Sequence, residues 1–150
     1  MDAVTYPEKE VVSFIGDNII PLRVAHNAAP LSNDFMVKWT PTLIVLDISG
    51  KEHYRTVGFL PVAELIPSLL LGMGKSCFDL DEYEPALEDF DRAIQGYPQS
   101  FSTPEAVYLK GITRYKSTHE VKALKELHEK LRNDYPASVW AQRSLPYRLL

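Results

Sequence analysis

A proline directly before the most apolar strand-like stretch constrains the fold more than any other feature. Trp39-Thr40-Pro41-Thr42 runs into Leu43-Ile44-Val45-Leu46-Asp47, and Ser49-Gly50 then predicts a turn. Proline has no backbone N–H, so it fits the start of a strand but not its middle. Cis peptide bonds occur almost only before proline, and we expect the Thr40–Pro41 bond to be cis. The apolar residues 42–48 predict a strand buried on both faces.

Helix and strand patterns alternate upstream of this proline. Apolar spacing predicts a short helix over residues 8–16. Residues 19–25 read as a strand, which Pro21 would place at a sheet edge because it cannot donate to a ladder hydrogen bond. Leu31 and Phe35 then suggest a short helix that ends before Trp39.

A hairpin and a helix are predicted downstream. Residues 53–58 are polar at alternate positions, as expected for the hairpin partner of residues 42–48. Pro61 fits the first residue of a helix, and apolar residues at helical spacing extend it to Met73. Pro67 lies inside this helix and predicts a kink or a break.

This order of elements resembles the second half of a thioredoxin fold over residues 1–73. In the thioredoxin superfamily, the proline loop lies beside a redox-active Cys-x-x-Cys, so the resemblance implies that Trp39, Thr40 and Pro41 bind substrate. The only cysteine here is Cys77, far downstream. The resemblance therefore implies an α/β fold that is incomplete, β-α-β-β-α, without the first strand-helix-strand unit and without a catalytic residue.

The absent unit includes a central strand, which in the family lies between the counterparts of residues 19–25 and 42–48. Its loss would leave buried backbone groups unpaired, at about 1 to 3 kcal/mol each. Three outcomes are open: a closed three-stranded antiparallel sheet, a second copy or another chain that fills the gap, or a native start upstream of Met1.

From residue 74 to residue 150 the pattern is helical throughout. Residues 70–98 resemble a tetratricopeptide repeat, in which small residues let paired helices approach and large ones fill the space between hairpins. The matching residues are Leu70, Met73, Gly74, Tyr83, Ala86, Phe90, Ala93 and Pro98. A second, weaker copy begins near Ala106, has Gly111 in the place of Gly74 and ends at Pro136. Residues 137–144 are expected to form a closing helix.

Charge is the feature of the helical region that could serve binding. Seven acidic residues lie between Asp79 and Asp91 with no basic residue among them, whereas ten Lys and Arg face five Asp and Glu from Arg92 onward. Two interpretations are open: attraction between adjacent hairpins, or a concave surface that docks a charged protein or peptide. For the second, the candidate residues are Tyr108, Lys110, Arg114 and Lys122.

No other side chains suggest chemistry. Cys77 is expected to be a small buried residue, since the nearby carboxylates Asp79, Asp81 and Glu82 would raise its pKa. The four histidines have no metal-ligand spacing and are expected at the surface; they are His26, His53, His119 and His128. We predict no metal site and no cofactor.

Composition excludes some classes of partner. The net charge of −4 argues against general nucleic-acid binding. No apolar run approaches the roughly 20 residues that span a bilayer, and the N-terminus lacks the pattern of a secretory signal. The expected location is cytoplasmic.

Two functional hypotheses follow. In the first, the chain is a thioredoxin-like relative of thiol-disulfide oxidoreductases, inactive by itself because the dithiol is absent. In the second, it is a non-catalytic module that binds proteins through its helical repeats.

Overall fold

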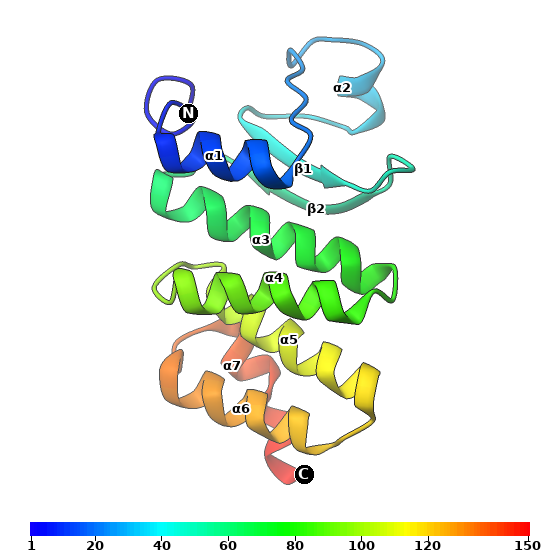
Figure 1. Cartoon of the computed structure of the whole chain (residues 1–150), viewed down its shortest axis with the longest axis vertical. Helices are drawn as coiled ribbons and strands as arrows, with labels where there is room; N and C mark the ends of the chain where they lie inside the picture. The colour runs from blue at the N-terminus through cyan, green and yellow to red at the C-terminus, as the bar shows by residue number, and fades with distance from the viewer.

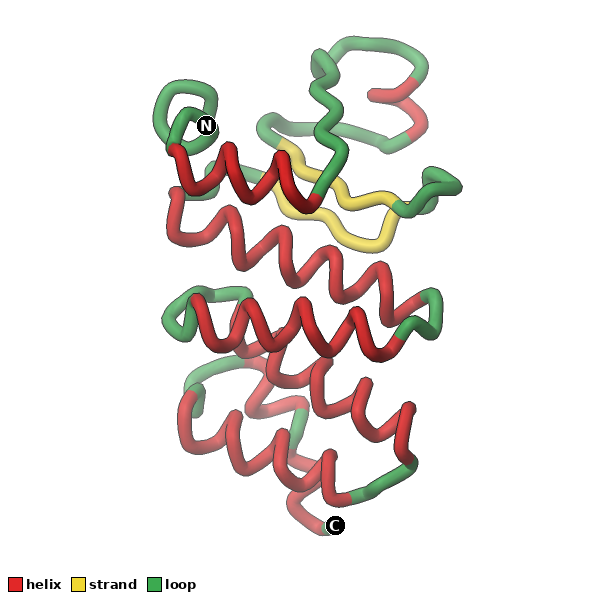
Figure 2. Tube along the Cα trace, in the orientation of Figure 1, coloured by secondary structure: helices red, strands yellow, loops and turns green.

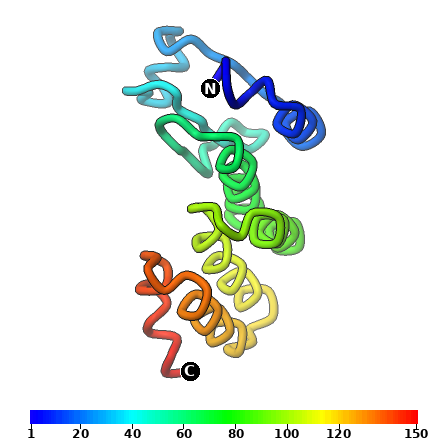
Figure 3. Tube along the Cα trace, turned by 90° about the vertical axis from the view of Figure 1, so that its left-hand side faces the viewer, coloured from blue at the N-terminus to red at the C-terminus, as the bar shows by residue number.

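The computed structural model describes all residues, 1–150, as a two-stranded sheet on a stack of helices (Figures 1 and 2). The N-terminal part holds α1 (Lys9–Asn18), α2 (Leu31–Asp34), β1 (Thr42–Leu46) and β2 (Glu52–Val57). The helices are α3 (Val62–Asp79), α4 (Tyr83–Gly96), α5 (Thr103–Thr118), α6 (Lys122–Asp134) and α7 (Val139–Arg143), followed by the 3-10 helix η1 (Leu145–Leu149). Figure 3 shows these layers following one another from the N-terminal to the C-terminal end. No helix is both long and apolar enough to cross a membrane.

The hairpin forms as expected, but it is less buried than expected. β1 pairs antiparallel with β2, and the Thr40–Pro41 peptide bond is cis, as the sequence predicts. The prediction that residues 42–48 are buried on both faces is wrong, because β1 is only half-buried and Leu46 is 38% exposed. One face of the hairpin packs on α3, and no other helix packs against either strand.

The strand predicted over residues 19–25 is absent. α1 continues past its expected end to Asn18, and the chain then crosses to α2 without regular structure. No backbone–backbone hydrogen bond involves Ile20 to Val24, and Ile20 is 96% exposed. The alternating apolar pattern is a strand pattern, but a strand needs a neighbour with which to pair, and the sheet consists of β1 and β2 alone. The predicted order β-α-β-β-α therefore lacks its first strand.

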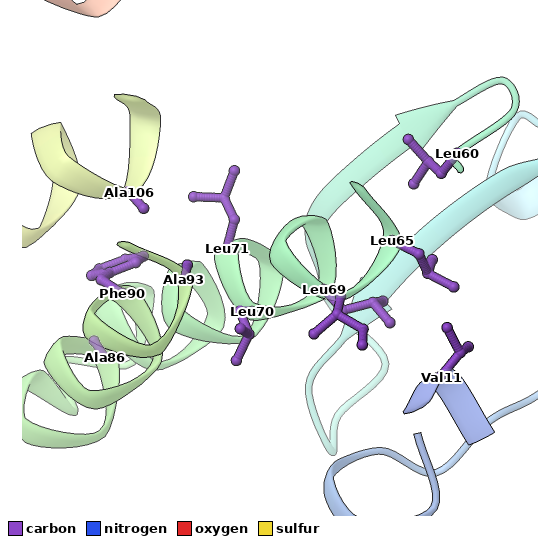
Figure 4. Packing of buried hydrophobic residues seen from close by; sticks show 11 residues of the cluster. Val11, Leu60, Leu65, Leu69, Leu70, Leu71, Ala86, Phe90, Ala93 and Ala106 are labelled. Atoms are coloured by element: carbon purple, nitrogen blue, oxygen red, sulfur yellow. The ribbon is translucent and has the colours of Figure 1, made fainter. Parts of the chain in front are cut away.

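Helix α3 is the central element of the molecule. It is continuous through Pro67, so of the predicted kink or break the break is wrong. The predicted boundary between residues 73 and 74 lies inside this helix. All eight residues from Leu65 to Gly72 are buried, as expected for a helix covered on every side. Its core includes Val11 of α1, Phe90 of α4 and Ala106 of α5 (Figure 4).

The helices pair in sequence order as the repeat pattern predicts. A Cβ atom added at Gly74 would lie 2.5 Å from Cε1 of Phe90, and one at Gly111 would lie 2.3 Å from Cδ2 of Leu127. These two glycines therefore set how closely α3 approaches α4 and α5 approaches α6. The C-terminal residues form the expected closing helix as α7, and Ala141 joins a second core with Leu124, Leu127 and Leu131.

We expect Gly74→Ala to lower the free energy of unfolding by about 1 to 3 kcal/mol through overpacking. The Phe90 ring is fully buried and cannot move into solvent, so the clash outweighs the gain of about 1 kcal/mol in helix propensity. Gly16→Ala in α1 is the matched control, because nothing lies within 4 Å of its added Cβ, and it should hold or raise stability. Urea denaturation followed by circular dichroism gives the unfolding midpoint of each variant. A midpoint of Gly74→Ala equal to that of wild type would contradict this packing.

Candidate functional site

The proline loop and the free edge of β1 form one continuous surface. The hydroxyl of Thr42 donates to the carbonyl of Trp39 at 2.7 Å, which closes the loop around Pro41. The Trp39 side chain is 70% exposed, although aromatic side chains are usually buried. The structure thus places Trp39, Thr40 and Pro41 together, at the point where β1 begins.

The free edge of β1 carries unpaired backbone groups. The N–H of Gly58 donates to the carbonyl of Pro41 at 2.8 Å, so Leu43 and Val45 are the residues that pair with β2. The N–H and C=O groups of Thr42 and Ile44 then point away from β2. No backbone hydrogen bond from another segment reaches them. We call these groups the open edge of β1.

Exposed apolar side chains gather in the same part of the molecule. Of the 19 exposed large hydrophobic residues, 12 lie between Val4 and Phe59. Ile20, Leu22 and Val24 are 96%, 77% and 40% exposed, and Met36 is 69% exposed. Single exposed hydrophobic residues are normal, so what distinguishes this chain is that most of its exposed ones belong to the first 59 residues.

A buried histidine fixes the opposite end of the hairpin. Nε2 of His53 lies 2.9 Å from Oδ2 of Asp47, and Nδ1 lies 2.7 Å from Oδ2 of Asp79 at the end of α3. The His53 side chain is fully buried. The other oxygen of Asp47 accepts from the N–H groups of Ser49 and Lys51, so one carboxylate organises the turn and holds the imidazole.

A β-bulge in β2 explains how the His53 side chain comes to lie against α3. Val45 pairs with Tyr54 and Leu46 pairs with Glu52, so His53 is the extra residue of β2. A bulge redirects side chains, and here consecutive residues both reach α3: His53 through Asp79, and Tyr54 through the hydroxyl of Ser68 at 2.9 Å. The expectation that His53 is exposed is therefore wrong. The alternating pattern of residues 53–58 gives no sign of the bulge.

The two carboxylates favour the protonated form of His53. The Asp47 carboxylate first, and the Asp79 carboxylate second, raise the pKa of His53 above its ordinary value of 6.5, against the effect of burial. The bonds from His53 and from the Ser49 hydroxyl hold the pKa of Asp47 far below its usual range. A protonated imidazole donates to both carboxylates, so the cluster joins the hairpin to α3 electrostatically. No group of three or more His, Cys, Asp and Glu side chains is placed to hold a metal ion.

The other histidines and the cysteine divide between core and surface. His26 and His119 are exposed as expected, whereas His128 is buried and only 5% exposed, which corrects the prediction for it. Cys77 is half-buried. Burial first, and then the charges of Asp89 and Glu82, raise its pKa, so Cys77 is not an activated nucleophile.

The four predicted partner-binding residues do not form one surface. Lys110 and Arg114 line a cleft of about 150 Å³ between α4, α5 and α6, and Lys122 lies beside it through Glu126. Tyr108 instead packs against Trp140, with ring centroids 5.1 Å apart, and its hydroxyl lies 3.2 Å from that of Tyr147.

The cations of that cleft already have acidic partners within the chain. Lys110 bonds to Asp91 of α4, and Arg114 bonds to Glu126 at 2.9 Å. Lys116 reaches Asp81 at 3.4 Å. The acidic run and the basic region thus attract each other between adjacent helices, which is the first of the two interpretations that the charge pattern left open.

Comparison with protein-family models, with curated protein sequences and with solved structures found no match for this chain.

We expect His53 to make stability fall with rising pH. Its folded pKa is raised, so its contribution is complete below about pH 6.5 and is lost as pH rises through the folded value. His53→Gln should remove this loss, whereas the exposed control His26→Gln should keep the wild-type profile. Urea denaturation between pH 5 and pH 9 measures the free energy of unfolding of each variant. The same dependence on pH in wild type and His53→Gln would contradict a stabilising role of this cluster.

Proposed function

We propose that this chain is a non-catalytic protein-interaction module that takes up an extended segment of a partner protein as an added strand along β1. The observation that carries the proposal is the open edge of β1. Thr42 and Ile44 present N–H and C=O groups that no other backbone segment satisfies. Such an edge pairs readily with a further strand.

Exposed apolar side chains in the N-terminal part indicate what the partner segment is like. Ile20, Leu22 and Val24 stand exposed on a segment that has no backbone pairing of its own. Trp39 is exposed at the start of β1. A partner strand with apolar residues at alternate positions would satisfy the backbone of β1 and cover part of this apolar surface.

We further propose that the N-terminal part is thioredoxin-like and that the helices are tetratricopeptide-like. Supporting observations are the order of α1, β1, β2 and α3, the cis bond at Pro41, and the glycine–apolar contacts at Gly74 and Gly111. In a thioredoxin fold, a central strand lies along this same edge of the strand that follows the cis-proline. The resemblance and the unpaired backbone groups therefore favour the same position for a partner strand.

A second candidate is a thiol-disulfide oxidoreductase in which Trp39, Thr40 and Pro41 orient the substrate. The cis-proline loop favours it. Residues 1–150 hold one cysteine, so its dithiol would have to lie outside them. The intact mass and the alkylatable thiol count of the endogenous protein test this candidate: a mass of 17.0 kDa with one thiol would exclude it.

The interaction hypothesis is tested with peptides selected by display on the immobilised chain. We expect the enriched peptides to alternate apolar and polar residues, and Ile44→Pro to weaken their binding at least about tenfold. Proline at residue 44 removes an outward N–H without removing a bond to β2. Loss of one backbone hydrogen bond to the peptide, together with poorer packing beside the proline ring, costs about 1.4 kcal/mol or more of binding free energy.

Val57→Pro is the matched control. Val57 lies opposite Thr42, so its N–H points outward at the opposite edge of the sheet, which belongs to β2. Its affinity for the peptides should stay within about twofold of wild type. Hydrogen exchange of the Ile44 amide should slow when peptide is bound. Equal binding by Ile44→Pro and wild type would contradict the proposal, and dimers in sedimentation that Ile44→Pro abolishes would identify a second copy as the partner.

A further inference from the structure

α6 and the C-terminal segment lie at the other end of the molecule from β1 (Figure 1). A second cleft lies there, between α6 and η1. Its volume is about 190 Å³, and no hydrophobic residue lines it. α6 contributes most of the lining and η1 contributes one guanidinium; the residues are Lys125, His128, Glu129, Arg132, Asn133 and Arg148. A wholly polar cleft between packed helices favours a charged ligand over an apolar one.

The cations of this cleft have no partner in the protein. Lys125, Arg132 and Arg148 take part in none of the ion pairs or side-chain hydrogen bonds of the chain. This contrasts with the cleft at Lys110 and Arg114, where acidic side chains already take the charge. Glu129 also lines the cleft and makes no ion pair, so the four charged side chains sum to +2.

His128 also lines this cleft and is largely buried. The residue is only 5% exposed, and its Nδ1 lies 2.8 Å from the hydroxyl of Ser144. That hydroxyl donates its single proton to the carbonyl of Ala141 at 2.7 Å, so it accepts from Nδ1–H of His128. Nε2 of the neutral ring is therefore an acceptor that has no donor in the chain.

Nε2 of His128 keeps some contact with solvent. The one fully buried side-chain polar atom without a partner in the chain is Oγ of Ser102, so Nε2 is not sealed inside the core. The bond to Ser144 fixes the ring, and His128 lines the same cleft as Lys125, Arg132 and Arg148.

We infer that this cleft binds a phosphate group, either free or carried as a monoester. Its donors are the ammonium of Lys125, the guanidinium groups of Arg132 and Arg148, and the amide of Asn133. Arginine and lysine side chains make charge-assisted bonds to phosphate oxygens, and arginine does so with two parallel donors. The charge of +2 matches a phosphate dianion, whereas a nucleic-acid backbone would require a longer basic surface.

The test uses the full chain and nuclear magnetic resonance titrations at pH 7.5. The probes are sodium phosphate and O-phosphoserine, with sodium chloride at matched ionic strength as the salt control. We expect saturable shifts at His128 and Arg132 with both phosphate probes and none with chloride. Tighter binding of O-phosphoserine indicates a phosphate carried on another molecule, and equal binding indicates free phosphate as the ligand.

Variants on the same helix separate a specific site from general attraction. Arg132→Gln should weaken phosphate binding about tenfold, the effect of one charge-assisted contact. Lys130→Gln removes an equal charge from α6 outside the cleft, where Lys130 pairs with Asp134 at 2.8 Å, and should change affinity less than twofold. Arg132 is exposed, so its replacement should leave the circular dichroism spectrum unchanged. Equal weakening by the two variants, or shifts that follow ionic strength alone, would overturn the inference.

Discussion

The close packing of α3 on both of its sides is the constraint on which the rest of the structure depends. A Cβ atom at Gly72 would lie 2.7 Å from Cγ2 of Val45 in β1, and one at Gly74 would lie 2.5 Å from the ring of Phe90 in α4. Residues two positions apart lie on nearly opposite sides of a helix. α3 can therefore touch the hairpin and the first helical partner at once, and one core joins the two halves.

The hairpin depends on this contact because a two-stranded sheet is at best marginally stable by itself. Tyr54 and His53 bind α3 from consecutive positions, one through Ser68 and the other through Asp79. This attachment holds β1 in place although one of its edges is unpaired. A rigid but unpaired edge is well suited to pairing with a further strand, because little conformational entropy is lost when the partner binds.

The helical part has one region in which acidic and basic side chains pair and another in which cations have no acidic partner. Between α3, α4 and α5, acidic and basic side chains pair with each other, as Lys75 does with Glu105 at 2.8 Å. Only the last cleft, at Lys125, Arg132 and Arg148, gathers cations without acidic partners around the fixed imidazole of His128. The proposed protein-binding edge and the proposed phosphate site thus lie at opposite ends of the stack and rely on different forces.

The sequence by itself determined the local structure: the cis bond at Pro41, the hairpin, the helices, and the small residues Gly74 and Gly111 that let helices approach. These features follow from proline chemistry and from periodicity, which report the conformation of neighbouring residues. Only the tertiary structure decided that residues 19–25 form no strand and that His53 and His128 are buried. A strand exists only beside a partner, and His53 meets Asp79, 26 residues away, through a bulge that no periodic pattern reveals. Such contacts arise from packing between distant segments, which a local pattern does not encode.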